Sequence, residues 1–198
     1  MVVDVARESR IRDLNAALVQ TGLAETDLAE ALGVSASRLV AYRSGEVAPS
    51  TAFVSWATHV ALGLHSATER GWMTSRATAA AVRAALAEQD EMWAFKMMLQ
   101  GRDHLHALLQ ERPSLGGSWE AAPGSTGADQ WDVMLAAVAA HEFTFVGLSA
   151  PAWTIGAVLS TPWILDSPRL TPTEVRARTP AWLAERGVFV CERDLGTA

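Results

Sequence analysis

The residue types that most often carry catalysis or bind metals are sparse in this chain. His104 and His106 are two positions apart in a predicted helix, so they point to different faces and are poorly placed to share a metal. His141-Glu142 lacks the second histidine that a metalloprotease helix requires. The sequence has no Gly-rich phosphate loop, no cysteine pair for zinc and no serine elbow. It therefore predicts a protein that is not an enzyme and needs no metal or other cofactor.

A short polar run offers a different chemistry, which is hydrogen bonding to DNA. Ser35, Ser37 and Arg38 lie where a helix is predicted to begin, and the Ser35 hydroxyl can cap that helix. Leu39 and Tyr42 are spaced to face inward, which leaves the polar residues on the outside. Side chains in the first turn of such a helix can enter the major groove, where arginine reads guanine.

The elements that must position this run are two short helices with a tight turn between them. Leu28, Ala29 and Leu32 form the apolar stripe of the first helix, and the second helix is predicted over residues 36–44. Gly33 permits the left-handed backbone that ends the first helix, and Gly45 ends the second. A helix that closes at Thr21-Gly22 precedes the pair, and Pro49-Ser50 opens another after it. Five short helices are expected to pack as a bundle over residues 7–64.

This pattern resembles the phage-repressor and Cro-type helix-turn-helix family, often called the Xre family. The matching residues are LAEALGVSASRLVAYRSGEVAPS, and the resemblance covers roughly the first third of the chain. It implies sequence-specific binding to double-stranded operator DNA. The DNA-contacting residues that it implies are Thr26, Ser35, Ala36, Ser37, Arg38, Ala41, Arg43 and Ser44. Family members often have glutamine where Glu25 stands, and a carboxylate there repels phosphate although it suits the helix N-terminus.

Charge argues against strong DNA binding by a single copy. Residues 1–65 hold five arginines and seven acidic residues, and the whole chain has a net charge of −6. Because counterion release from phosphates drives nonspecific affinity, nonspecific binding is expected to be weak. Specific binding then requires a homodimer that reads two half-sites about one DNA turn apart.

Length and composition restrict the class of protein. A chain of 198 residues that is 49% hydrophobic can bury a core and form one or two domains. No apolar run reaches the ~18 residues of a membrane helix, and the first ten residues do not resemble a signal peptide. The single cysteine, Cys191, fits a reducing compartment. These observations predict a cytoplasmic protein that does not bind membranes.

The fold class predicted is all-α, with an N-terminal five-helix helix-turn-helix bundle and a second, mostly helical domain that ends in an irregular Trp/Pro-rich segment. The predicted boundaries are 1–65 for DNA binding, 66–76 for a linker and 77–198 for a sensor or partner-binding domain. The elements expected after the linker are a helix over 77–112, a Gly/Pro/Ser-rich loop over 113–127, a helix over 128–146, a capping box at 171–174, a short helix over 180–186, and a brief strand or extended tail at 188–191.

Three tryptophans of the last third, Trp153, Trp163 and Trp182, each follow a proline closely. Such turns can hold an indole against the chain's own domain, and we favour that role for at least two of them. The alternative is that one or more anchors a partner, because tryptophan is enriched at interface hot spots.

Three functions are compatible with this layout. In the first, the chain is an autorepressing antitoxin whose C-terminal half binds a toxin; TPAWLAERGVFVCERDL resembles regulators encoded beside nucleotidyltransferase-type toxins. In the second, the helical half closes around a small apolar molecule. The residues that would line its pocket are Met92, Trp93, Phe95, Met97 and Met98, which also suit a plain core. In the third, the chain is a scaffold that does not bind DNA.

Overall fold

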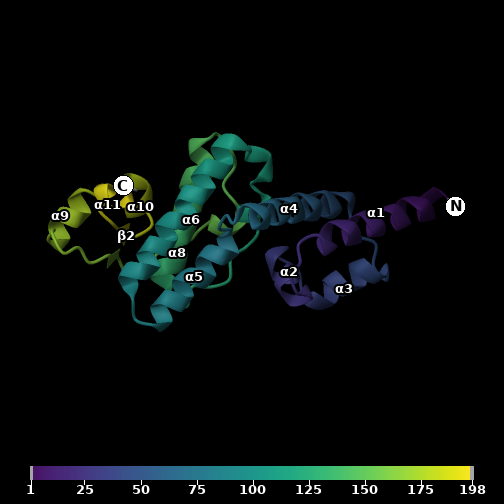
Figure 1. The fold of residues 1–198 in the computed structure, drawn as a ribbon, viewed down its shortest axis with the longest axis horizontal. Helices are drawn as coiled ribbons and strands as arrows, with labels where there is room; N and C mark the ends of the chain where they lie inside the picture. The colour runs from purple at the N-terminus through teal and green to yellow at the C-terminus, as the bar shows by residue number, and fades with distance from the viewer. Residues whose placement is uncertain (1, 197–198) are drawn as a thin grey trace.

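Helices form most of the chain, which confirms the all-α prediction. The computed structural model describes residues 2–196. In chain order its elements are α1 (Val2–Val19), α2 (Glu25–Ala31), α3 (Ala36–Ser44), α4 (Thr51–Arg70), α5 (Ser75–Ala87), α6 (Glu91–Glu111), η1 (Pro113–Leu115), α7 (Gly117–Glu120), α8 (Asp129–Phe145), η2 (Ala152–Thr154), β1 (Trp163–Ile164), α9 (Pro172–Ala177), α10 (Ala181–Ala184), β2 (Val188–Phe189) and α11 (Glu192–Leu195). The molecule is elongated, with α1 to α3 at one end and α9 to α11 at the other (Figure 1).

The first four helices surround one apolar core, which contains Leu14, Leu28, Leu39 and Val60. Five short helices were expected over residues 7–64, but the described chain has four there because α4 is a single helix of 20 residues. Ala67 continues its buried face beyond the expected end at residue 64. Burial of this continuous face favours helix over loop.

The predicted linker over residues 66–76 is mostly structured. It contains the end of α4, a turn over residues 71–74 and the first two residues of α5. Gly71 ends α4 with a φ of +64°, a backbone conformation that glycine adopts at little cost. The connection between the two parts of the chain is therefore short and helical at both ends.

Residues 77–112 form two helices, α5 and α6, and not the single helix expected. The chain reverses between them at Gln89, whose φ is +60°, and at Asp90. The Asp90 carboxylate accepts a hydrogen bond from the Trp93 backbone N–H at 2.8 Å and so caps α6. Helices α5 and α6 then lie side by side (Figure 1). The helix expected over 128–146 is confirmed as α8.

The Gly-rich segment 113–127, predicted as a loop, contains two short helical elements. It contains η1 and α7, and the indole of Trp119 on α7 is fully buried. Glycines let α7 approach α4 closely, since a Cβ placed on Gly63 would lie 2.5 Å from the Ser118 backbone nitrogen. A Cβ on Gly117 would lie 2.5 Å from the His59 carbonyl oxygen. Helix α4 therefore packs against α1 on one side and directly against the α7 backbone on the other.

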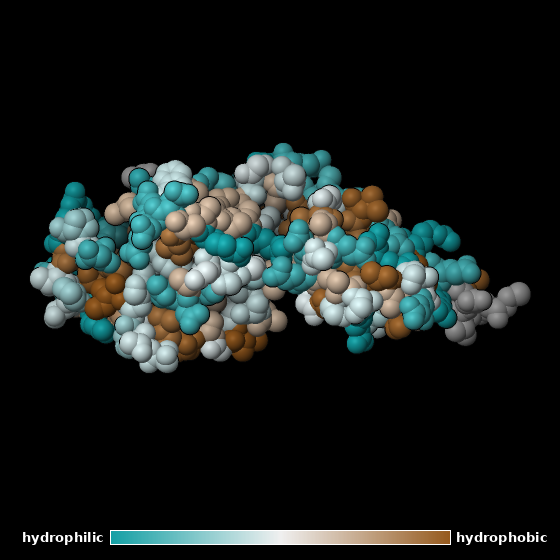
Figure 2. Space-filling view, turned by 90° about the horizontal axis from the view of Figure 1, so that it is seen from below, coloured by the Kyte–Doolittle hydropathy of each residue, from teal (hydrophilic) through white to brown (hydrophobic). Residues whose placement is uncertain are grey.

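Helices α9 to α11 and strand β2 form a small unit beside α6 and α8 (Figure 1). Strands β1 and β2 pair in parallel, with Trp163 opposite Val188, so part of the 188–191 segment is a strand. The capping box at the start of α9 is confirmed, with Thr171 and Glu174 bonded reciprocally. None of the described helices is both long and apolar enough to span a membrane. On the face shown in Figure 2, apolar side chains form small groups separated by hydrophilic ones.

Candidate nucleic-acid interface

The turn between α2 and α3 has the predicted geometry. Gly33 has a φ of +64°, and the Val34 backbone N–H returns to the Ala29 carbonyl oxygen at 3.0 Å. The Ser35 hydroxyl accepts a hydrogen bond from the Arg38 backbone N–H at 3.2 Å, which fixes the start of α3. Gly45 ends the helix in the left-handed conformation. The predicted caps and bounds of α3 are confirmed.

One face of α3 is buried and the other is open. Leu39 and Tyr42 point into the core, and the Tyr42 ring lies 4.9 Å from that of Phe53, centroid to centroid. The predicted DNA-contacting residues that are exposed on α3 and its cap are Ser35, Ala36, Ser37, Arg38 and Ser44, and we call them the α3 face. Ala41 is half-buried beside them, and Thr26 is exposed on α2. The structure therefore brings most of the predicted set onto the surface of one helix.

Arg38 is the cation of the α3 face. Its Nε donates a hydrogen bond to the Tyr42 hydroxyl at 2.8 Å, and its guanidinium carbon lies 5.4 Å from the centre of the Tyr42 ring. Within the described residues, no carboxylate oxygen lies within 4.0 Å of this guanidinium. Tyr42 thus holds Arg38 along the helix surface while leaving its charge unneutralised.

Arg43 faces other helices instead of the open face. Its Nε donates to the Asn15 side-chain oxygen at 2.9 Å, and its Nη1 lies 3.4 Å from a carboxylate oxygen of Glu25. Asn15 also donates to the Arg43 carbonyl oxygen at 3.1 Å. Arg43 therefore ties α3 to α1 and α2. Asn15 and Arg7, which donates to the Gly45 carbonyl oxygen, were not predicted from the sequence, because their partners are distant along the chain.

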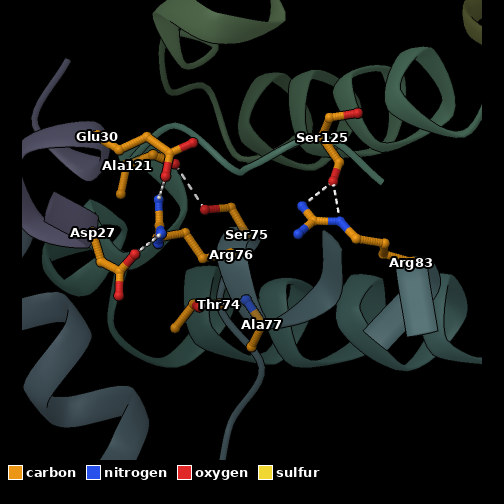
Figure 3. A network of polar contacts seen from close by, with 9 residues as sticks. All are labelled: Asp27, Glu30, Thr74, Ser75, Arg76, Ala77, Arg83, Ala121 and Ser125. Carbon is orange, nitrogen blue, oxygen red and sulfur yellow. Dashed lines mark hydrogen bonds and ion pairs between the residues drawn. The ribbon is translucent and has the colours of Figure 1, made fainter. Parts of the chain in front are cut away.

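The acidic residues of α2 are paired with arginines. Arg76, at the start of α5, places one guanidinium nitrogen 3.0 Å from Glu30 and another 3.4 Å from Asp27 (Figure 3). Glu25 is paired with Arg43. The excess of acid counted in residues 1–65 is therefore partly offset by a cation from outside that segment.

Polar contacts also join α4 and α5 to the segment 113–127. The Ser75 hydroxyl donates to the Ala121 carbonyl oxygen at 2.7 Å, and Arg83 donates to the Ser125 carbonyl oxygen (Figure 3). On α4, the His59 imidazole lies 3.1 Å from a carboxylate oxygen of Glu120. The hydrogen bond and the charge of Glu120 raise the pKa of His59 above its usual 6.5, against the opposing effect of burial.

The three tryptophans proposed as partner anchors all contact their own chain. The Trp153 indole N–H donates to the Trp119 carbonyl oxygen at 2.9 Å, and the Trp163 ring packs 5.2 Å from that of Trp131. Trp182 is half-buried and stacks on His141, with ring centroids 4.3 Å apart and planes 10° apart. Trp182 lies near the surface, because His141, on which it stacks, is itself only half-buried.

The histidines have structural partners. His104 accepts a hydrogen bond from the Met73 backbone N–H at 2.9 Å, whereas His106 lies 2.8 Å from a carboxylate oxygen of Glu142. The two therefore point in different directions, as their spacing predicted. Burial lowers the pKa of His141 below its usual 6.5. Within residues 2–196, no three His, Cys, Asp or Glu side chains are grouped so as to hold a metal ion.

Comparison with known proteins gave no match to a family model, to a curated protein or to a solved structure.

Proposed function

We propose that this chain is a sequence-specific DNA-binding transcriptional regulator that works as a homodimer. The observation that carries the proposal is the α3 face, which begins at a capped helix N-terminus and bears serines, Arg38 and no carboxylate. Serine and arginine at this place suit base edges and phosphates, and the helix N-terminus adds partial positive charge. A homodimer is proposed because two copies of α3 would read half-sites roughly 34–36 Å apart.

The charge distribution supports DNA binding over the scaffold alternative. The negative charge of residues 1–65 favours a scaffold. The carboxylates of Glu25, Asp27 and Glu30 each lie within 4.0 Å of a guanidinium, so their repulsion of phosphate is reduced. The positive charge of Arg38 has no such partner among the described residues.

For the rest of the chain we propose binding to a toxin protein of the nucleotidyltransferase type, with repression of the chain's own operon. The support is charge: residues 66–198 carry eleven basic and fifteen acidic residues, which suits a basic toxin surface. Co-expression with the product of the adjacent gene should give a stable complex and relieve its toxicity. Failure to bind that product would exclude the antitoxin role and leave the DNA-binding proposal intact.

Fluorescence anisotropy with a duplex from the chain's own promoter and a scrambled duplex tests DNA binding. We expect tighter binding to the promoter, with a shallow salt dependence between about 50 and 200 mM salt. If Arg38 reads a guanine, Arg38→Ala should weaken promoter binding by about 1–3 kcal/mol, roughly 5- to 150-fold in Kd, with a smaller loss on scrambled DNA.

The matched control is Arg193→Ala, which removes the same charge from an exposed site on α11, at the other end of the molecule (Figure 1). It should leave both affinities nearly unchanged. If Arg38→Ala weakens binding to the two duplexes equally, Arg38 contacts only phosphate. Equal or absent binding by the unmodified protein to the two duplexes would refute the proposal.

A further inference from the structure

A second feature of the molecule lies far from α3. A groove of about 970 Å³ separates the first half of α6 from the segment 165–170 and from α11. Ligand pockets in proteins typically measure about 300–1,000 Å³, so this groove has room for a small organic molecule. It is larger than the hollow of about 290 Å³ beside His106 and Trp182.

The walls of the groove are held in place without a ligand. On one side, the Leu165 backbone N–H donates to the Phe189 carbonyl oxygen at 3.0 Å, which extends the β1–β2 pairing. The Glu192 backbone N–H donates to the Arg178 carbonyl oxygen at 2.9 Å. On the other side, Arg102 of α6 donates to the Leu195 carbonyl oxygen of α11. These bonds make the groove a preformed feature, which lowers the free-energy cost of binding.

Apolar side chains from two segments line the interior: Met92, Phe95 and Leu99 from α6, and Leu165 and Leu170 from the opposite wall. Met92 is 56% exposed, so its side chain is accessible to a molecule that enters the groove. Its flexible thioether can adapt to the shape of a bound molecule. The apolar lining therefore supplies binding free energy in proportion to the area that a ligand covers.

The charged residues of the groove favour a ligand that carries no net charge. The described lining includes four acidic and four basic side chains, for example Glu91, Asp166, Arg169 and Arg193. A charged ligand would be attracted by one set and repelled by the other, while it would lose hydration on entering. We infer that this groove binds an uncharged, largely apolar small molecule. The inference does not depend on DNA binding.

Two probes with the same apolar body test the site. N-phenyl-1-naphthylamine is uncharged, and its 8-sulfonate derivative carries one negative charge. We expect the uncharged dye to saturate one site per chain with a micromolar Kd and the sulfonate to bind at least fivefold more weakly. Cys191, the only cysteine of the chain, lines the groove but is only 3% exposed, so its alkylation by iodoacetamide should be slow, and the uncharged dye should slow it further.

The variants compare two adjacent exposed residues. Met92→Glu places a carboxylate in the groove and should weaken dye binding at least tenfold, whereas Met92→Leu should retain it. Trp93→Glu is the control, because Trp93 is 49% exposed but lies outside the lining. It should change the Kd less than twofold.

Four results would overturn the inference. They are no saturable binding of the uncharged dye, equal losses for Met92→Glu and Trp93→Glu, binding that leaves Cys191 alkylation unchanged, or equal or tighter binding of the sulfonate. The last would overturn the uncharged class of ligand, and the others the site itself.

Discussion

Replacing Gly63 with alanine tests whether α4 and α7 are joined backbone to backbone. A Cβ at this position would lie 2.5 Å from the Ser118 nitrogen and 2.9 Å from the Leu115 carbonyl oxygen. Non-bonded heavy atoms prefer separations of about 3.5 Å or more, so the two segments would have to move apart by about 1 Å. Because both clashes are with backbone atoms, no rotamer change relieves them.

The expected magnitude combines two opposing effects. Alanine in a helix interior is favoured over glycine by about 1 kcal/mol. Overpacking a core typically costs about 1–3 kcal/mol, and a clash with rigid backbone belongs at or above the top of that range. We therefore expect a net loss of about 2 kcal/mol in the free energy of unfolding, which is a fall of about 4–8 °C in Tm for a chain of this size.

Scanning calorimetry of the full chain measures this effect. Gly101→Ala serves as a control, because its Cβ would meet the Thr78 side chain and not backbone. The double variant Gly101→Ala/Thr78→Ala should recover much of the stability that Gly101→Ala loses. No side-chain truncation should rescue Gly63→Ala. A Tm for Gly63→Ala equal to or above that of the unmodified protein would refute the close α4–α7 contact.

Two further predictions concern charged groups. Glu25→Gln should release Arg43 and remove a carboxylate near the proposed DNA surface. The slope of log K against log[salt] for promoter binding should then steepen by about 0.9. Glu111→Gln, at an exposed position on α6, is the control, and an unchanged slope for Glu25→Gln would contradict the prediction. Since the pKa of His59 is raised, its contact with Glu120 stabilises the fold below pH 6.5 and loses that effect as the pH rises through the folded-state pKa. His59→Gln should therefore lower Tm at pH 6 more than at pH 8. His141, whose pKa burial lowers, gives a substitution effect with the opposite pH trend, because its charging opposes folding as the pH falls.

Local rules explain what was predicted correctly from the sequence. The Ser35 cap, the Gly33 turn and the Thr171–Glu174 capping box each depend on residues within three or four positions of one another. Their physical basis is contained in a short stretch of sequence. The bounds of α3 and α8 followed from the same kind of information, with burial of the apolar face adding to it.

The features that were missed depend on residues that meet only after folding. Glycines in the 113–127 segment indicate a loop when considered locally, yet Gly117 is there because α7 must approach α4. The break between α5 and α6 had a local signal, since Asp90 can cap the helix that follows, but the left-handed conformation of Gln89 is not one its residue type predicts. Arg76 pairs with residues 46 and 49 positions away, and no periodicity indicates this.

The same distant contacts show why a charge count over residues 1–65 describes the DNA surface poorly. Charges act over about 8 Å at physiological ionic strength, so the arrangement around α3 matters more than the sum for the segment. Arg76 lies beyond residue 65 and offsets two carboxylates of α2. Ala121 of the Gly-rich segment belongs to the apolar core that α1 to α4 surround, and α4 extends past residue 65 to Arg70. A cut at residue 65 would therefore break α4 and leave Asp27 and Glu30 without their partner, so the proposed DNA-binding surface depends on residues from both parts of the chain.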